Sequence, residues 1–368
     1  MDLHLANPNL KNPEFYVPGL PADWVTAHYG IPADEVAKLG SAENPFGPSP
    51  KALASITAEL GNVHLYSPWT AEPLREALAA KYGYTPENFV CGSGETEVIA
   101  LIIRAFAEPG GQVLMTRPCF PMYHLFTEAE GRHPVYIDTP TMTCEVDAYI
   151  DAIGPDTRIV FVTNPHSPSG TWLEEADVRR IVQAAPHALV ALDEAYVHYS
   201  DTPGYIHLAA EYDNLIVLRT FSKAFGLAGL RLGFGVAHPN LIPPLLAVKP
   251  TWNVGRLQIA GGIAALTDDE HVDRTITAIL EGKAHATARF AELDRFRLVP
   301  GTRSNFMLIE ILDPDTDSTL VFKDLLERGV IVKDGSVSFR GLEKRYLRSD
   351  INLPHRMDHL VDALADLP

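Results

Sequence analysis

The amino-acid sequence predicts an α/β protein with a mostly parallel central sheet and a smaller α+β domain at its C-terminal end. Between residues 89 and 237, short apolar runs alternate with helical patterns, which is typical of βαβ units. The strand-like runs lack regular polar alternation, as expected for strands that are covered on both faces. From residue 254 onward a long helical stretch leads into a mixed pattern. A chain of 368 residues is long enough for two such domains.

The N-terminal part and the large domain are predicted from the order of these patterns. The start, rich in Pro and Asn, predicts an extended arm with one short helix near "ADWVTAHYG", and "ENPFGPSP" predicts a loop. Strand-like runs follow at "FVCGS", "QVLMT", "HPVYID", "RIVFVTN", "ALVALDEA", "NLIVLRT" and "LGFGVA". Helical patterns between them are "ETEVIALIIRAFA", "CFPMYHLFTEAEG" and "EEADVRRIVQAA". We therefore expect an N-terminal arm at residues 1–45 and a large domain at residues 46–254.

The remaining residues, 255–368, predict a small C-terminal domain. One helical stretch runs from "LQIAGG" to "AELDRF" and precedes the strand-like "SNFMLIEIL". A helix at "LVFKDLLERG", strand-like runs at "VIVKD" and "YLRSDI", and a closing helix complete the pattern. We expect the N-terminal arm to pack with this domain or with a partner subunit.

The composition argues against several classes of protein. A formal net charge of −17 disfavours binding to nucleic acid or to an anionic membrane surface, because both depend on basic patches. The start has no basic segment followed by an apolar one, and the longest apolar runs are too short to span a bilayer. The three cysteines are widely spaced and form no CxxC pair. We therefore expect reduced thiols, no metal site and a cytoplasmic protein.

Polar residues that follow the predicted strands are the first candidates for function, because doubly wound sheets bind ligands beyond the carboxyl ends of their strands. Lys223, in "TFSKAFGLAGLRLGF", follows the strand-like "NLIVLRT". A lysine that burial desolvates can act as a Schiff-base nucleophile. Thr220, Ser222 and Arg231 lie near it in sequence and offer two hydroxyls and a guanidinium to a phosphate dianion. Without these neighbours, a surface lysine on a loop would be the better interpretation.

Other candidates are weaker when each is taken alone. Asp193 ends "ALVALDEAY", where a carboxylate either meets a cation, such as a protonated pyridine nitrogen, or caps the next helix. Tyr196 could hydrogen-bond a phenolic oxygen on the same ring. The glycine loop "CGSGETEV" opens a helix and suits a phosphate, although such turns are common. Phe120 could stack on a heterocycle or belong to the core, and Arg348 could bind a substrate carboxylate or pair with Asp350.

Together these candidates meet the needs of one cofactor. An amine, an acid, a tyrosine, an aromatic ring and a phosphate cradle are the groups that pyridoxal phosphate requires. The sequence therefore predicts a pyridoxal phosphate enzyme in which Lys223 carries the aldehyde.

Four stretches of the chain, "TFSKAFGLAGLRLGF", "LDEAY", "ENPFGPSP" and "NPHSPSG", are similar to motifs of the fold-type-I, class II aminotransferases. Within them the sequence most resembles the histidinol-phosphate aminotransferase group, from "YVPG" at residue 16 to the C-terminal helix. This resemblance implies a three-layer fold of the aspartate aminotransferase type and pyridoxal phosphate as the cofactor. It also implies a homodimer whose subunits share their active sites.

The resemblance implies a role for each matched residue of the cofactor site. Lys223 would form the internal aldimine and then move a proton between the substrate Cα and the cofactor C4′. Asp193 would keep the pyridine nitrogen protonated, Tyr196 would bond O3′, and Phe120 would stack on the ring. The implied phosphate ligands are Thr220, Ser222 and Arg231 with Gly94, Glu95 and Thr96.

Further matches concern the substrate and the partner subunit. Tyr66, in "HLYSPW", matches a tyrosine that reaches the partner's phosphate across the dimer interface. Arg348 matches the arginine that binds the substrate carboxylate, or its equivalent in amino alcohol phosphates. We also expect Tyr16 and Asn44, which lie in the matching segments, to contact the substrate.

Two departures from the family pattern fall in the cofactor site. Ser167, beside His166 in "NPHSPSG", stands where the family usually has an asparagine that donates to O3′. The serine hydroxyl can donate but is shorter, so O3′ could be held differently. Glu95 replaces a small residue, and its carboxylate must therefore point away from the phosphate.

Three departures fall near the substrate. Lys333, in "VIVKD", stands where histidinol-phosphate enzymes often carry a second arginine for the substrate phosphate, and it lacks the arginine's bidentate fork. Asp350 adds an acid near the site of the substrate carboxylate. Arg256, in "NVGRLQ", is either an unusual cation near the active site or a solvated residue at a helix start.

The reaction we expect is amino transfer from an L-amino acid or histidinol phosphate to a 2-oxo acid, by a ping-pong mechanism. The alternative is another reaction on the same scaffold: decarboxylation of an amino acid phosphate, or oxidation or cyclisation of an amino acid in a biosynthetic pathway. A cofactor-sensing regulator would need a DNA-binding module, and the residues before "ENPFGPSP" are too few and too poorly basic to provide one.

Overall fold

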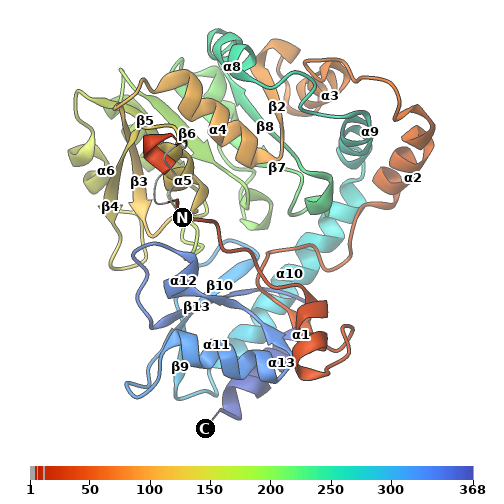
Figure 1. Cartoon of the computed structure of the whole chain (residues 1–368), viewed down its shortest axis with the longest axis vertical. Helices are drawn as coiled ribbons and strands as arrows, with labels where there is room; N and C mark the ends of the chain where they lie inside the picture. Colours follow the sequence, from red (N-terminus) through yellow and green to blue (C-terminus); the bar gives the residue numbers. More distant parts are fainter. Residues whose placement is uncertain (1–4, 6, 11–12, 368) are drawn as a thin grey trace.

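The computed structural model describes residue 5, residues 7–10 and residues 13–367. Figure 1 shows two parts, a large domain with the central sheet and a small domain below it, with the long helix α10 (Asp269–Phe290) running from one to the other. The predicted α/β class with a small C-terminal domain is confirmed. Within the described residues, the helices are too short or too polar to cross a membrane.

The central sheet of the large domain has seven strands in the order β2-β8-β7-β6-β5-β3-β4. The pairs β7–β6, β6–β5, β5–β3 and β3–β4 are parallel, whereas β8 runs antiparallel to both of its neighbours. The strands are β2 (Phe89–Ser93), β3 (Gln112–Arg117), β4 (His133–Asp138), β5 (Thr157–Thr163), β6 (Leu189–Asp193), β7 (Leu215–Thr220) and β8 (Leu232–Ala237). Each of them falls in a strand-like run predicted from the sequence.

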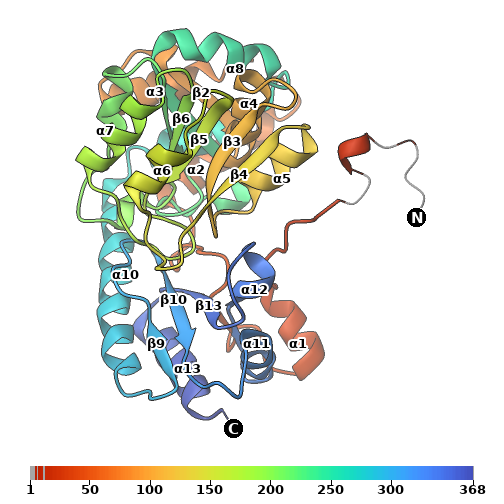
Figure 2. The same cartoon turned by 90° about the vertical axis from the view of Figure 1, so that its left-hand side faces the viewer.

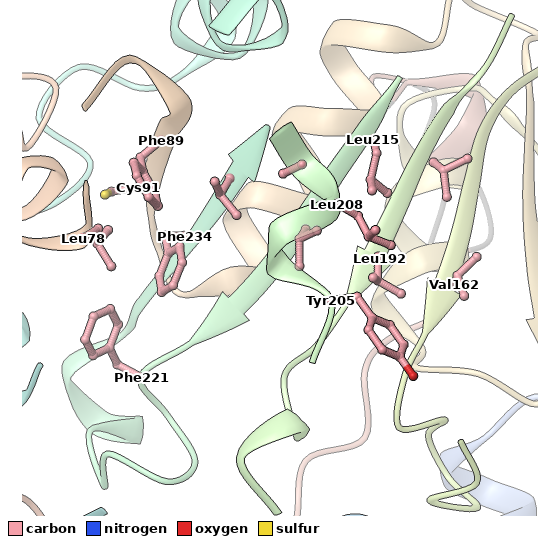
Figure 3. Close-up of a cluster of buried hydrophobic side chains, with 14 of the residues drawn as sticks. Leu78, Phe89, Cys91, Val162, Leu192, Tyr205, Leu208, Leu215, Phe221 and Phe234 are labelled. Atoms are coloured by element: carbon pink, nitrogen blue, oxygen red, sulfur yellow. The ribbon is translucent and has the colours of Figure 1, made fainter. Parts of the chain in front are cut away.

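Both faces of this sheet are buried, which explains why its strands lack polar alternation. Successive residues of β5 belong to opposite apolar clusters: Val160 and Val162 to one, Ile159 and Phe161 to the other. Figure 3 shows part of the first cluster, with side chains from β5, β6, β7 and β8 on one face of the sheet. Helices cover the two faces, so the domain has three layers (Figures 1 and 2).

The helices of the large domain include several that the sequence patterns did not predict, namely α2, α3, α6 and α8. The full set is α2 (Pro50–Glu59), α3 (Glu72–Tyr82), α4 (Glu95–Phe106), α5 (Met122–Ala129), α6 (Val146–Ala152), α7 (Glu175–Ala184), α8 (Ile242–Val248) and α9 (Arg256–Ala265). The start of α2 illustrates the local cause, because the Ser49 hydroxyl accepts from the Ala52 backbone N–H and Pro50 occupies the first turn.

The long helical stretch predicted after residue 254 is two helices, α9 and α10, which are separated near Leu266. Helix α9 packs against α2 and α3 of the large domain. Two glycines allow this approach, since a Cβ at Gly261 would meet Ile56 of α2 and one at Gly262 would meet Leu74 of α3 as well as Leu232 of β8. The expected division of the chain at residues 254–255 stays a prediction.

The small domain contains a four-stranded antiparallel sheet in the order β12-β13-β10-β9. Its elements after α10 are β9 (Phe296–Leu298), β10 (Phe306–Ile311), α11 (Ser318–Glu327), β11 (Val330–Ile331), β12 (Lys333–Asp334), α12 (Gly335–Ser338), β13 (Tyr346–Asp350) and α13 (Pro354–Ala365). The N-terminal segment lies on it: α1 (Ala22–Tyr29) packs near α11, and β1 (Ala37–Lys38) pairs in parallel with β11. Residues 13–21, before α1, run along the side of the molecule toward the large domain (Figure 2).

Candidate active site

A cavity of about 440 Å³ lies where the large domain, the small domain and the N-terminal arm meet. This volume suits a cofactor together with a small substrate. The residues that line it include the ends of β5, β6 and β7, the first turn of α4, parts of the small-domain sheet, and the arm. They are Tyr16, Gly40, Ser41, Glu43, Glu95, Thr96, Ile99, Phe120, Pro121, Met122, Thr163, Ser167, Asp193, Ala195, Tyr196, Thr220, Ser222, Lys223, Ala228, Arg231, Lys333, Ser338, Phe339 and Arg348.

Lys223 lies in the turn after β7. Its Nζ donates a hydrogen bond to the Ser41 carbonyl at 3.1 Å and lies 5.4 Å from the centre of the Tyr196 ring. Burial lowers the pKa of Lys223, and the nearby Arg348 lowers it further. Because the neutral amine is the form that attacks an aldehyde, this environment favours the nucleophile.

Asp193 ends β6, opposite Thr163 of β5. Its carboxylate accepts hydrogen bonds from the Tyr123 hydroxyl at 2.5 Å and from the Ala195 backbone N–H at 3.0 Å. Burial raises the pKa of Asp193, and these two donors oppose the rise. The carboxylate is thus fixed in orientation at the cavity wall, where a cationic ring nitrogen would stabilise its charge.

Glu95 is the first residue of α4, and it lines the cavity beside Asp193. Burial raises the pKa of Glu95 well above its usual range, and the Asp193 carboxylate raises it further. We assign the proton of this pair to Glu95, because Asp193 already accepts from two donors. The expectation that the Glu95 carboxylate avoids the phosphate stays a prediction.

The start of α4 and the Arg231 side chain form a site for an anion. Gly94 precedes the helix with a φ of 81°, and a Cβ at this position would overlap the Arg231 guanidinium. Only glycine therefore allows the two to approach. The backbone amides at the start of the helix, the guanidinium and the hydroxyls of Thr220 and Ser222 together suit a phosphate.

Three side chains that line the cavity could hold a flat ring between these groups. Phe120 lies edge-on to the Tyr123 ring at 5.7 Å. Burial raises the pKa of Tyr196 to about 12, so its hydroxyl stays a donor at neutral pH. Ser167 is 1% exposed, and within the described residues its Oγ has no hydrogen-bond partner. A buried hydroxyl is costly unless a ligand bonds it, so the residues present fit pyridoxal phosphate.

His166, next to Ser167, has a structural role and is not among the residues described as lining the cavity. Its ring contacts the Ser169 hydroxyl at 2.7 Å and the Thr116 hydroxyl at 3.1 Å. Burial lowers the pKa of His166 to about 4, so the ring is neutral under ordinary conditions. It fixes the loop that carries Ser167.

Two cations lie opposite each other in the small-domain part of the cavity. Lys333 of β12 pairs directly with Arg348 of β13, and each is only 6% exposed. The Arg348 guanidinium lies between the rings of Phe306 and Phe339, at 4.7 and 5.5 Å, and among the described residues its Nε has no hydrogen-bond partner. Burial, and then Arg348, lowers the pKa of Lys333 to about 8. Like charges in this register are destabilising, and the Asp350 carboxylate, 3.6 Å from the Arg348 guanidinium, offsets part of their repulsion.

The N-terminal arm closes the same part of the cavity. Tyr16 lies edge-on to Phe120 at 6.4 Å, and the Lys333 ammonium is 5.1 Å from the centre of the Tyr16 ring. The ammonium also donates to the Val17 carbonyl at 2.6 Å. Tyr16 therefore lines the cavity beside Lys333, and its contact with the substrate stays a prediction.

Asp350 lies behind Arg348 and binds the arm. One carboxylate oxygen accepts from the backbone N–H groups of Ser41 and Ala42, at 2.7 and 2.5 Å. The other is 3.6 Å from the Arg348 guanidinium. Burial raises the pKa of Asp350, whereas Arg348 and these amides oppose the rise. Asp350 therefore shapes the turn whose Ser41 carbonyl receives the Lys223 amine.

Several residues singled out in the sequence are not among the lining residues that the structure describes, namely Gly94, His166, Asp350, Asn44, Tyr66 and Arg256. The Asn44 amide donates to the Ala224 carbonyl at 2.9 Å and to the Thr275 hydroxyl at 3.1 Å, so it ties the arm to the chain after Lys223. Tyr66 is 76% exposed and stacks on Trp252 with ring centres 4.2 Å apart. Arg256 pairs with Glu59 at 2.5 Å. The substrate contact of Asn44 and the partner contact of Tyr66 stay predictions.

Several residues of the site were missed by the sequence analysis. Tyr123, which holds Asp193, has the pattern of a buried helix residue, and only its spacing from Phe120 could have drawn attention to it. Thr163, Ser41, Glu43 and Phe339 also line the cavity. Glu43 stands in the quoted "ENPFGPSP" motif, which was the available signal for it.

Comparisons with known proteins agree with this geometry. Residues 34–364 match the family model "Aminotransferase class I and II". A histidinol-phosphate aminotransferase of Symbiobacterium thermophilum is 37% identical over 351 residues, which cover 95% of this chain and 94% of that protein. In these comparisons the expected relationship to the histidinol-phosphate aminotransferases is confirmed.

Solved structures show the same fold. The histidinol-phosphate aminotransferase of Sinorhizobium meliloti, solved in complex with pyridoxal-5'-phosphate, superimposes with a TM-score of 0.87 at 24% identity and covers 98% of this chain and 96% of that one. The L-threonine-O-3-phosphate decarboxylase of Porphyromonas gingivalis has a TM-score of 0.79 at 21% identity, with 89% and 98% covered. The family match and the fitted cavity together identify an enzyme whose cofactor is pyridoxal phosphate. The chain belongs to the class I and II aminotransferases.

Proposed function

We propose that this aminotransferase moves an amino group between histidinol phosphate, or an L-amino acid, and a 2-oxo acid such as 2-oxoglutarate. The observation that carries the proposal is the pair Lys333 and Arg348, two buried cations that face each other in the cavity that holds Lys223. All substrates of such a reaction carry an anionic group, either a phosphate or a carboxylate. An anion bound here would offset the repulsion between the two cations. The similarity to a histidinol-phosphate aminotransferase supports histidinol phosphate as one substrate.

The residues that would hold the cofactor follow from the cavity lining. The Lys223 amine would bind it covalently, Asp193 would face its ring nitrogen, and Ser167 and Tyr196 would donate to its phenolic oxygen. Its phosphate would lie against Thr220, Ser222, Arg231 and the first amides of α4. Bound there, pyridoxal phosphate supplies an electron sink for the substrate Cα.

The proton that leaves the substrate Cα must be accepted by a side chain of the protein. We propose that the Lys223 amine accepts it, because burial and Arg348 hold the pKa of this lysine below its usual value. The Ser41 carbonyl, which receives the Lys223 amine, would keep the released amine near the cavity. Arg348 would orient the substrate by binding its carboxylate, with Phe306 and Phe339 on either side of the guanidinium.

We further propose a homodimer with shared active sites. The segment after α2 exposes several large apolar side chains: Leu60, Val63, Leu65, Tyr66 and Trp69. Trp252, which is also exposed, stacks on Tyr66. A group of exposed large apolar side chains of this kind is typical of an interface. Arg231 is exposed at the rim of the cavity, and its carbonyl accepts from Gln258 of α9, which begins beside the Tyr66 segment. Tyr66 would reach the partner's phosphate site from this patch.

We also propose a cytoplasmic enzyme. The cysteines Cys91, Cys119 and Cys144 are free thiols. Burial raises the pKa of each to about 12, which keeps them protonated and unreactive. Unpaired cysteines are typical of a reducing compartment, and cell fractionation with an antibody to the protein would test this location.

A donor screen tests the proposed reaction. The protein is loaded with pyridoxal phosphate and mixed with histidinol phosphate, L-glutamate, L-histidine or L-aspartate, each without a 2-oxo acid. We expect histidinol phosphate and one amino acid to convert the cofactor stoichiometrically to pyridoxamine phosphate, followed by absorbance and by mass. Release of carbon dioxide instead would contradict amino transfer and indicate a decarboxylase.

A further inference from the structure

Arg340, in the loop after α12, joins three separate parts of the chain. Its guanidinium donates to the Glu128 carboxylate of α5 at 2.6 Å and to the Tyr136 hydroxyl of β4 at 2.5 Å. It also donates to the carboxylate of Glu14 in the N-terminal arm. The small domain, the large domain and the arm therefore meet at one side chain.

Each segment that Arg340 holds carries a wall of the cavity. Phe339 precedes Arg340, lines the cavity and packs with Met142 of the large domain and Leu308 of β10. Glu14 stands two residues before Tyr16, which lines the cavity against Phe120. Arg340 itself is not among the lining residues that the structure describes.

The backbone around Arg340 is shaped for this contact. Gly341 has a φ of 85°, and a Cβ there would overlap the Arg117 side chain of β3. The loop can approach the large domain this closely only with glycine. In the arm, Glu14 has a second neighbour, because its carboxylate also lies 3.5 Å from Nε2 of the buried His124.

We propose that Arg340 is a positioning residue for substrate binding, because it fixes Phe339 and Tyr16 as the two walls around Lys333 and Arg348. The planar guanidinium has enough donors to serve three acceptors at once, whereas an ammonium group lacks this fork. The ion pairs of Arg340 with Glu14 and Glu128 are partly exposed. Isolated pairs of that kind contribute little to the free energy of unfolding. Their effect here arises because one residue holds two segments of the chain at the same cavity. The catalytic consequence rests on the proposed amino transfer.

The test compares Arg340→Gln with Arg297→Gln in the full-length protein loaded with pyridoxal phosphate. Arg297 makes an exposed ion pair with Glu310 at 2.5 Å in the small-domain sheet, far from the cavity lining. We expect Arg340→Gln to raise KM for the amino donor about tenfold, with kcat and the affinity for pyridoxal phosphate within about twofold. Arg340→Lys should recover only part of this loss, and Arg297→Gln should change nothing.

Hydrogen exchange supplies a readout that does not depend on the reaction. Amides of residues 13–20 should exchange about tenfold faster in Arg340→Gln than in the parent protein, and those of α1 should not. Glu128→Gln should act in the same direction and should be non-additive with Arg340→Gln. Unchanged exchange in residues 13–20 together with unchanged KM would overturn the proposal. If no donor is processed at all, the proposed function fails, and the exchange result alone decides the role of Arg340.

Discussion

The two ends of the cavity are built in different ways. At the cofactor end, Asp193, Thr163 and Thr220 stand at the ends of adjacent parallel strands of one sheet. Asp193 already has its donors in place, at 2.5 and 3.0 Å. At the substrate end, Arg348 comes from the small domain and Tyr16 from the arm, and the Arg348 Nε has no partner within the described residues.

This difference shows that only the substrate end depends on how the domains and the arm are positioned. The cofactor end is fixed by the sheet, whose hydrogen bonds set the spacing of the strand ends. The substrate end exists only while three chain segments are held together by Asp350, Lys333 and Arg340. Changes at the cofactor end should therefore alter the chemical step or the binding of the cofactor, and changes at the substrate end should alter the affinity for the substrate.

Asp193→Asn should give the largest effect, a loss of kcat, because it removes the charge at the cofactor end of the cavity. The amide keeps the shape and can still accept from the Tyr123 hydroxyl, but it no longer stabilises a protonated ring nitrogen. We expect kcat to fall by about 10² to 10⁴, with a change in the absorbance of the bound cofactor. The KM for the donor should change far less. A variant with parental kcat would show that Asp193 is only a helix cap.

Arg348→Gln should give the next largest effect, and it should appear in KM. Loss of a charge-assisted bidentate contact costs about 1.5 to 3 kcal/mol, so KM should rise about 10- to 100-fold. Steady-state kinetics with donor and 2-oxo acid varied separately would measure this. Arg348→Lys is the matched control. Its KM should lie between those of the parent protein and Arg348→Gln, because lysine keeps the charge but lacks the bidentate fork of arginine. Equal losses in kcat and kcat/KM would contradict a binding role.

The pH dependence of KM tests the substrate end of the cavity separately from the cofactor end. The pKa of Lys333 is lowered to about 8, so the side chain is charged below that pH and neutral above it. The affinity for an anionic substrate should therefore fall about three- to tenfold as the pH rises from 7 to 9. Lys333→Arg should remove this dependence, because arginine stays charged throughout. A parental profile in Lys333→Arg would assign the titration to another group.

Ser167→Ala should have the smallest effect. The hydroxyl is one of two donors expected at the phenolic oxygen of the cofactor, so Tyr196 should retain most of the binding. We expect the affinity for pyridoxal phosphate to fall about three- to tenfold, as for the loss of one hydrogen bond of about 1 kcal/mol. Equilibrium titration followed by absorbance would measure it. An unchanged affinity and an unchanged spectrum would mean that Ser167 does not reach the cofactor.

At the cofactor end, the sequence indicates for a physical reason which candidate residues come together. Lys223, Asp193 and Arg231 stand next to strands that the apolar runs reveal, and parallel strands bring their ends to one edge. The seven strands themselves were predictable for the same reason.

The rest depends on packing that no short segment encodes. The register that sets Lys333 opposite Arg348, and the turn that brings Ser41 to Lys223, join residues far apart in the chain. Helices α2 and α3 were not predicted, although Ser49 and Pro50 are helix-start signals for α2. Tyr123 was hidden because a buried helix tyrosine looks like core until its hydroxyl is seen on Asp193.

The attachment site of the cofactor tests the central claim most directly. The protein is incubated with pyridoxal phosphate, reduced with borohydride, digested and mapped by mass spectrometry. Lys333 is the strongest competitor, since it lines the same cavity and burial lowers its pKa to about 8. The structure predicts a stoichiometric pyridoxyl group on Lys223 alone, and none in Lys223→Ala. Labelling of Lys333 or of another lysine in the parent protein, with Lys223 unmodified, would contradict it.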